Sequence, residues 1–181
     1  MTLNAKYIVL LCASLLMAWM IVYGTVSTPW SFPETIQQRE WERPDTSDAP
    51  QWTNIAHQQL TQNAPSDLQE RLRTAMQALP WVAVTWSWIS VSGARALQTL
   101  WTQWPTLAWD ERVHLHPEYD GSLHLAVDQP LAQRLVDAWR AEYHPRNWWA
   151  VMIYWPRDDD ELQFVIDLLE YVHKNAHKNV Q

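Results

Sequence analysis

The sequence predicts an α+β protein in which an N-terminal transmembrane helix precedes a small mixed domain. Two observations lead to this prediction. Residues 7–24 form an uncharged apolar run, and from residue 65 onward segments with helical apolar spacing alternate with segments rich in β-branched and aromatic residues. The chain has 181 residues, 48% of them apolar, so it is long enough for one compact domain and additional segments.

The uncharged run at the N-terminus is long enough to cross a lipid bilayer, because a spanning helix needs about 20 apolar residues and at least about 17. Lys6 precedes the run and the next charged residue is Glu34, so the positive-inside rule places the N-terminus in the cytoplasm. We therefore expect a cytoplasmic tail at 1–6, a single span at 7–26 in the bacterial inner membrane, and the main domain in the periplasm. A cleaved signal peptide is the alternative, although its apolar region is normally shorter.

Residues 27–64 are expected to form a proline-rich linker that includes a weak helix. The stretch 29–50 contains four prolines and charges of both signs, without apolar periodicity. The weak helix is expected over 51–61. The folded periplasmic domain is then expected to cover residues 65–181.

Two segments in the first half of this domain have helical spacing. Residues 66–79 begin at Ser66, with Gln69 three residues later as in a capping box, and Pro80 follows the last residue. Residues 94–104 also place their apolar side chains on one helical face. Both segments are therefore expected to be helices.

Two further helices are expected in the second half of the domain. Residues 130–144 carry an apolar stripe that includes Trp139, behind a capping residue at Asp128 or Gln129. The final helix begins in the acidic sequence RDDDE at 157–161, whose negative charges suit the positive end of a helix dipole.

Strands are expected at 81–92, on both sides of a turn near residue 120, and at 148–156. Residues 81–92 are apolar or small at both alternating sets of positions, which is typical of a central strand covered on both faces. The expected order from residue 81 is strand, helix, strand, strand, helix, strand, and then the final helix. This order resembles the β-α-β-β-α-β pattern of ferredoxin-like domains, here with additional flanking helices.

Three histidines, His114, His116 and His124, fall within the hairpin sequence HLHPEYDGSLH at 114–124. We expect a three-residue turn that ends at Gly121 in the left-handed conformation, which pairs His116 with His124. In this register one face of the hairpin is aliphatic and the other carries all three histidines. A register that separates the faces in this way is favoured because one face has to be buried.

Three imidazoles on one face of a hairpin could hold zinc or copper, since both ions accept imidazole nitrogen. Two other interpretations stay open: the histidines belong to a polar, half-exposed sheet face, or their protonation modulates an interface. The sequence contains no HExxH motif, no glycine-rich phosphate loop and no GxSxG motif. No catalytic residue and no cofactor other than such an ion is therefore predicted.

Tryptophan is unusually frequent, with 14 residues in the chain. A domain of this size cannot bury all of them, and tryptophan dominates the hot spots of protein interfaces. The sequence therefore predicts an interaction surface that includes Trp86, Trp88, Trp148 and Trp149. The net charge of −7, without a basic cluster, argues against nucleic-acid binding.

Together these observations favour a non-enzymatic, single-pass component of a bacterial envelope-spanning assembly for secretion, pilus formation or conjugative transfer. Its periplasmic domain would contact other envelope proteins or a second copy of itself. In topology only, this order of segments is similar to that of the inner-membrane platform proteins of type II secretion and type IV pili. Two alternatives stay open: a periplasmic metal-binding or metalloenzyme domain that uses the histidine hairpin, and a cell-wall glycan-binding module.

Overall fold

The structure is a computed structural model, and it describes residues 30–32, 43–47, 57–62, 65–99, 111–147 and 149–175. The chain divides into two units, Met1–Ser31 and Phe32–Gln181. All of the helices and strands named below belong to the second unit.

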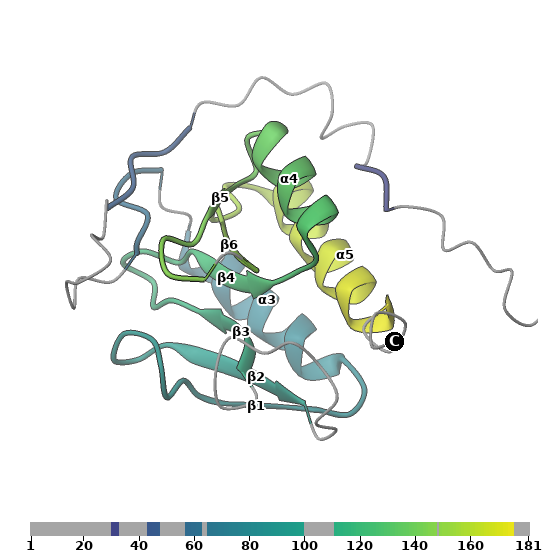
Figure 1. The fold of residues 1–181 in the computed structure, drawn as a ribbon. Coiled ribbons are helices and arrows are strands. Elements are labelled where there is room, and N and C mark those ends of the chain that lie inside the picture. Colours follow the sequence, from purple (N-terminus) through teal and green to yellow (C-terminus); the bar gives the residue numbers. More distant parts are fainter. Residues whose placement is uncertain are drawn as a thin grey trace, which may run out of the picture. The chain divides into compact units, whose positions relative to one another are not determined.

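The described part of the second unit contains one six-stranded sheet and three helices (Figure 1). In chain order the elements are α3 (Ser66–Ala78), β1 (Val82–Trp86), β2 (Arg95–Thr99), β3 (Glu111–Leu115), β4 (Leu123–Ala126), α4 (Gln129–Asp137), β5 (Ala141–Tyr143), β6 (Ala150–Ile153) and α5 (Asp159–Asn175). The strand order is β1-β2-β3-β4-β6-β5, and every neighbouring pair is antiparallel. The prediction of a mixed α+β domain is therefore confirmed.

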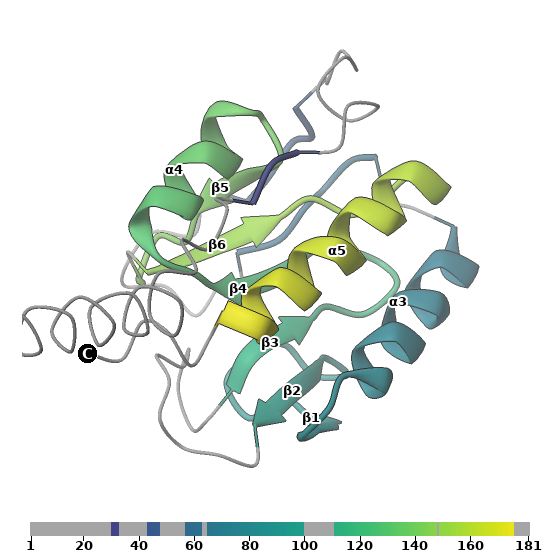
Figure 2. The same ribbon diagram turned by 90° about the vertical axis from the view of Figure 1, so that its right-hand side faces the viewer.

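The two faces of the sheet are covered by different parts of the chain. Figures 1 and 2 show α3 and α5 on one side of the sheet, and the segments 43–47 and 57–62 on the other. The helix-covered face is aliphatic, because residues that pair across β2, β3, β4 and β6 are all apolar and buried: Leu97, Val113, Leu125 and Val151. The core of the domain therefore lies between the sheet and these two helices.

The first predicted strand forms, but at the edge of the sheet. β1 covers only part of the predicted segment 81–92, and none of its five residues is buried. It pairs with β2 alone, at the end of the strand order. The prediction of a central strand covered on both faces is therefore wrong, because β1 is an edge strand among the residues that the structure describes.

Residues 95–99 form a strand, β2, where a helix was expected over 94–104; residues 100–104 lie outside the described part. Gly93 has a φ of +91° and reverses the chain, so that β2 pairs with β1 on one side and with β3 on the other. The short apolar pattern fits the period of a helix as well as that of a strand, because neighbouring residues are buried. Ala96 is buried on one face of the sheet and Leu97 on the other. The ferredoxin-like strand order is therefore wrong, because its first crossover helix is replaced by a strand.

The helix expected over 130–144 ends earlier. Asp128 is the capping residue, since its Oδ1 accepts a hydrogen bond from Leu131 N at 2.9 Å. α4 ends before Trp139, which has a φ of +57° and an exposed side chain instead of the inward one expected. The turn at this residue lets 141–143 form β5 beside β6. Sheet pairing thus replaces the last turns of the predicted helix.

The other two helices agree with their apolar stripes. In α3 the buried residues are Leu68, Leu72 and Met76, as expected, but Ser66 is the first helical residue and its side chain makes no capping hydrogen bond. The predicted capping box is therefore wrong. The backbone N–H of Glu161, in the first turn of α5, donates to Asp158 Oδ1 at 3.1 Å, so an acidic residue does cap the last helix.

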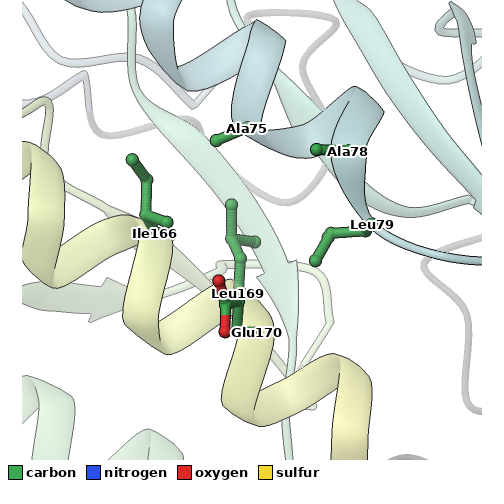
Figure 3. Close-up of a pocket in the computed structure, with 6 residues that line it drawn as sticks. All are labelled: Ala75, Ala78, Leu79, Ile166, Leu169 and Glu170. Carbon is green, nitrogen blue, oxygen red and sulfur yellow. The ribbon is translucent and has the colours of Figure 1, made fainter.

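A shallow apolar groove of about 170 Å³ runs between α3 and α5, and Figure 3 shows the residues that line it. They are Ala75, Ala78, Leu79, Ile166, Leu169 and Glu170. The small side chains on α3 leave this space because alanine does not fill the distance between two packed helices.

The predicted membrane span at 7–26 lies outside the described residues. None of the helices in the described part of the chain combines the length and the apolar character needed to span a membrane. In the predicted linker, residues 57–61 are not helical, and Gln59 forms an isolated β-bridge with Thr46. The weak helix expected over 51–61 is therefore wrong for these residues.

Candidate functional site: a buried histidine cluster

Five of the seven histidines in the chain lie together on the face of the sheet opposite to α3 and α5: His57, His114, His116, His124 and His144. Centroids of neighbouring rings are 4.7–5.6 Å apart. His144 is partly buried, and the other four are no more than 7% exposed. The polar, half-exposed sheet face considered from the sequence is therefore wrong.

The β3–β4 hairpin brings three of these residues together, although not in the predicted register. His114 pairs with His124, while His116 lies beyond the end of β3 and donates its N–H to Ser122 O at 2.9 Å. The expected pairing of His116 with His124 is therefore wrong by two residues. The separation of the faces is confirmed, because His124 stands 4.7 Å from the rings of both His114 and His116.

The longer loop explains the shift in register. The backbone N–H groups of Asp120 and Gly121 both donate to Pro117 O, at 3.0 and 2.7 Å. The loop therefore covers 117–121, whereas a loop of three residues was expected. Gly121 has a φ of +74°, as expected from the sequence. Only glycine fits here, because a Cβ at this position would lie 2.7 Å from Cδ2 of the Trp155 ring.

Asp120 orients His116. One carboxylate oxygen, Oδ2, is hydrogen bonded to His116 Nδ1, and the other accepts the backbone N–H groups of Gln59 and Ser122 at 3.0 and 3.1 Å. His116 therefore carries its proton on Nδ1 and keeps a lone pair on Nε2. This carboxylate–imidazole arrangement is the one that commonly lies behind metal-binding histidines.

Glu142 orients His57 in the same way. Its Oε1 is hydrogen bonded to His57 Nε2, while Oε2 accepts from Thr46 Oγ1 at 3.1 Å and from Arg43 Nη2 at 3.2 Å. Burial by itself raises the pKa of Glu142, but its hydrogen bonds with His57 and Thr46 and the charge of Arg43 outweigh burial and lower the pKa. An ionised Glu142 keeps the proton of His57 on Nε2 and leaves a lone pair on Nδ1.

A third carboxylate, Glu111, lies behind His114, with Oε2 at 3.7 Å from His114 Nδ1. Its oxygens also accept hydrogen bonds from Ser87 Oγ at 2.8 Å and from the backbone N–H of Trp88. Burial raises the pKa of Glu111, but interaction with His114 and these two hydrogen bonds outweigh burial and lower the pKa. Three of the clustered imidazoles thus each lie against a carboxylate of their own.

Three buried ring nitrogens of the cluster make no hydrogen bond: His57 Nδ1, His114 Nδ1 and His124 Nε2. His124 Nδ1 lies 2.8 Å from His114 Nε2. Glu111 Oε2, at 3.7 Å, favours a proton on His114 Nδ1, and in that tautomer His124 is the donor of the pair and its own Nε2 has a lone pair. Several imidazole lone pairs therefore point into one buried volume.

Three of the clustered imidazoles, those of His114, His124 and His144, favour the neutral form. Burial, followed by repulsion from neighbouring groups, lowers the pKa of His144 to about 4 and the pKa of His124 well below its usual value. Burial also lowers the pKa of His114, and Glu111 offsets only part of this effect. Neutral imidazole is the form that binds metal ions, so the site accepts a metal cation more readily than a proton.

Two sets of three histidines have ligand atoms within 4.8 Å of one another: His114, His116 and His124 in one set, and His57, His124 and His144 in the other. Two nitrogens bound to one tetrahedral zinc ion are about 3.3 Å apart, given Zn–N bonds of 2.0–2.1 Å. Both sets therefore need only small ring movements to hold an ion.

The structure thus brings together all three histidines that the sequence singled out, and adds two that sequence reasoning missed. His57 lies in the predicted linker and His144 in a predicted helix, so no local pattern connects either of them to the hairpin. Asp120 could have been found, because it follows His116 by four residues in a turn sequence.

A cleft of about 870 Å³ between α3 and the β3–β4 turn has one of the clustered histidines, His116, among its lining residues. The other side chains of the lining are mostly polar: Gln69, Glu70, Arg73, Arg95, Glu118 and Tyr119, besides Gly93, Leu115 and Pro117. Its mixed charge and size suit a polar aromatic or anionic small molecule better than a purely apolar one.

The predicted tryptophan surface is only partly visible. Trp86 and Trp88 are 58% and 79% exposed, and the Arg95 guanidinium lies 3.3 Å from the centroid of the Trp86 ring. Trp149 is half-buried against Ala126 and Ala150. Trp148 lies outside the described residues.

Residues 109–171 match the family model described as a luciferase domain. The match covers about a third of the chain, and it includes four of the five clustered histidines and all three carboxylates behind them. No curated protein and no solved structure matches the chain.

Proposed function

We propose that this chain is a metal-dependent oxidative enzyme whose centre is the buried histidine cluster, with a transition-metal ion held by His114, His116 and His124. The observation that carries the proposal is the set of neutral imidazoles whose lone pairs face one another in a buried volume. Ligands of this type suit copper, zinc, iron and nickel, and copper has the highest affinity among the divalent ions.

The energetic cost of the cluster supports a bound ion. A buried polar atom without a hydrogen bond costs about 1–3 kcal/mol, and the unpaired nitrogens of His57 and His124 incur that cost in the metal-free protein. A purely structural role would be served better by apolar residues of the same size. A metal ion satisfies these nitrogens at once, because each lone pair becomes a ligand.

The family resemblance supports oxidation as the class of reaction. A luciferase is by name an enzyme that emits light as it oxidises its substrate, and the matched region contains the histidine hairpin. A redox-active ion such as copper, when bound, would supply electron transfer between a substrate and oxygen. Asp120 and Glu111 would hold His116 and His114 in the ligand tautomer, and the cleft beside His116 would receive the substrate.

Metal analysis of the purified full chain tests the proposal. After chelation and reloading with Cu²⁺ or Zn²⁺, we expect at least one ion per chain after desalting, and less than about a tenth of that in the double variant His116→Ala, His124→Ala. The matched control is His173→Ala, in α5 and outside the cluster, which should keep the full content. Absence of a stoichiometric ion in the native chain, or equal content in the double variant, would overturn the proposal.

The role of the carboxylate behind His116 is tested by Asp120→Asn. The amide cannot hold the proton on Nδ1 as an ionised carboxylate does, so metal affinity should fall by about 10- to 100-fold. Asp159→Asn, which alters an exposed ion pair with Arg71, serves as the control and should leave the affinity unchanged. Competition with a chromogenic chelator measures both values.

A second proposal follows from the exposed indoles of Trp86 and Trp88, which favour a role in contacts with a partner protein of the bacterial envelope. Cross-linking from membranes should capture the same envelope protein with the native chain but not with the double variant Trp86→Ala, Trp88→Ala. Retention of that partner by the double variant would remove this surface from the proposal. The glycan-binding alternative predicts that the native chain is retained on peptidoglycan.

We also propose that residues 7–26 anchor the chain in the bacterial inner membrane, with the main domain in the periplasm. The support is the uncharged run and the charge asymmetry around it. The full chain should resist carbonate extraction, whereas a variant that lacks 7–26 should be released. Release of both would contradict the anchor.

A further inference from the structure

We infer that the histidine cluster holds two metal ions, and that His124 bridges them as an imidazolate. This inference deepens the proposed function and rests on it. The first ion is the one held with His114 and His116, and the second lies between His124, His57 and His144. The sequence did not predict this second metal site, and the luciferase-domain match does not include it, since His57 lies outside residues 109–171.

The position of His124 between the two sets carries the inference. Its Nδ1 faces His114 Nε2 at 2.8 Å, whereas its Nε2, on the other side of the ring, is buried and makes no hydrogen bond. The rings of His57 and His144 have centroids at 5.4 and 4.9 Å from that of His124. His124 belongs to both sets of three, and with Nδ1 toward His114 it has Nε2 left to serve the second ion.

His57 is already prepared as a ligand. Its Nε2 donates to Glu142, so its Nδ1 carries the lone pair, and this nitrogen is buried without a hydrogen-bond partner. Glu142 is itself held by Arg43 and Thr46, which fix the carboxylate from the side away from the ring. The pair repeats the Asp120–His116 arrangement, so each of the two sets contains a histidine hydrogen bonded to a carboxylate.

His144 completes the second set after a change of tautomer. In the metal-free protein its Nδ1 accepts the backbone N–H groups of Arg146 and Asn147 at 3.2 and 3.1 Å, so the ring proton is on Nε2. On metal binding that proton moves to Nδ1 and the two hydrogen bonds break. This loss is small beside the formation of a metal–nitrogen bond.

The acidic side chains around the histidines favour the binding of cations in the cluster. The bridging His124 releases its remaining ring proton to solvent and becomes an anion. The carboxylates of Glu111, Asp120 and Glu142 lie behind the ligand histidines, and the one of Glu142 is also paired with Arg43 at 3.2 Å. Buried carboxylates are unfavourable without positive charge nearby, so an ion in either set of histidines lowers the cost of burying them.

Copper titration of the full chain, followed by electron paramagnetic resonance, tests the inference. We expect two Cu²⁺ per chain, with a spectral intensity per copper well below that of isolated Cu²⁺ at low temperature, because ions bridged by an imidazolate couple magnetically. His57→Gln keeps a donor to Glu142 but removes the ligand nitrogen. This variant should bind one Cu²⁺ with the full intensity, while His173→Ala should behave like the native chain.

The outcomes separate the inference from the proposed function. One ion per chain in the native protein, lost in the His116→Ala, His124→Ala variant, would overturn the second site and leave the proposed function standing. No stoichiometric ion would overturn both. Two ions with the full uncoupled intensity would overturn the bridge, and so would two ions retained by both His57→Gln and His144→Ala. Circular dichroism of each metal-free variant shows whether it is folded.

Discussion

The two faces of the sheet are both buried, but by side chains of opposite character. On β3 and β4 the face toward the helices carries Val113 and Leu125, while the residues next to them, His114 and His124, turn to the other face. The helix-covered face excludes water with aliphatic groups. The other face, covered by 43–47 and 57–62, buries imidazoles and their carboxylates (Figures 1 and 2).

The aliphatic face of the sheet stabilises the fold, whereas the histidine face carries the candidate functional site. Full burial of a leucine side chain contributes about 1.5–3 kcal/mol to folding. Burial of an imidazole without a hydrogen-bond partner costs free energy. The free energy gained by burying the aliphatic face offsets this cost. A rigid sheet that is stabilised from one side can hold ligands on the other side in a fixed geometry.

The largest expected effect tests the aliphatic face. Leu125→Ala removes a fully buried side chain in β4 and should lower the free energy of unfolding by about 4 kcal/mol. Leu60→Ala, at a position that is 56% exposed, is the control and should change it by less than about 0.5 kcal/mol. Urea unfolding of the metal-free protein measures both. Similar losses in the two variants would show that the sheet is not stabilised mainly from the helix side.

The next effect tests how rigidly the histidine hairpin is held. Gly121→Ala combines a φ of +74° with a Cβ that would meet the buried Trp155 ring, so we expect a loss of about 3 kcal/mol. Gly93 also has a positive φ, but a Cβ there would meet only the Pro117 side chain, at 3.3 Å. Gly93→Ala should therefore lose about 1 kcal/mol, and equal losses would contradict the tight packing at Gly121.

Acid should lower the free energy of unfolding by protonating histidines on the histidine face. In the unfolded chain His144 titrates near pH 6.5, whereas in the folded protein burial and neighbouring charges lower its pKa to about 4. Between these values the unfolded state binds a proton that the folded state does not, so stability falls as the pH drops from 6.5 to 4. Allowing for its partial exposure, we expect this histidine to account for about 2 kcal/mol of that fall.

Urea unfolding of the metal-free protein at pH 7.5 and at pH 4.5 measures this fall. His144→Asn keeps an acceptor for the backbone N–H groups of Arg146 and Asn147 but does not titrate, so the variant should lose less stability in acid. An unchanged pH dependence in the variant would assign the acid sensitivity to other groups. His114 and His124 act in the same direction, because their pKa values are lowered too.

The smallest expected effect concerns a side chain that belongs to neither face. Trp88 is 79% exposed, so Trp88→Ala should change the free energy of unfolding by less than about 0.5 kcal/mol. The buried Trp155 provides the contrast, since Trp155→Ala should cost about 3–5 kcal/mol. A large loss on truncation of Trp88 would mean that this indole stabilises the domain, and would weaken its assignment to a partner surface.

Much of the fold could be predicted because its signals are local. The apolar stripes of α3 and α5 repeat over several turns, and β6 is a short apolar run before a proline. The sequence predicted helix at β2 and β5 because a few apolar residues fit the period of a helix as well as that of a strand. In both cases a positive φ, at Gly93 and at Trp139, reverses the chain, and pairing with a neighbouring strand then decides the structure.

By itself, the sequence determined that His114, His116 and His124 share one face of a hairpin, because the two-residue period of a strand places alternate side chains together. Only the tertiary structure decided that this face is buried, that His114 and not His116 stands opposite His124, and that His57 and His144 join them. The physical reason is the distance along the chain between the residues that interact. Alternation along a strand is a property of neighbouring residues, whereas the cluster depends on long-range contacts that bring Glu142 and the segment 57–62 against the hairpin.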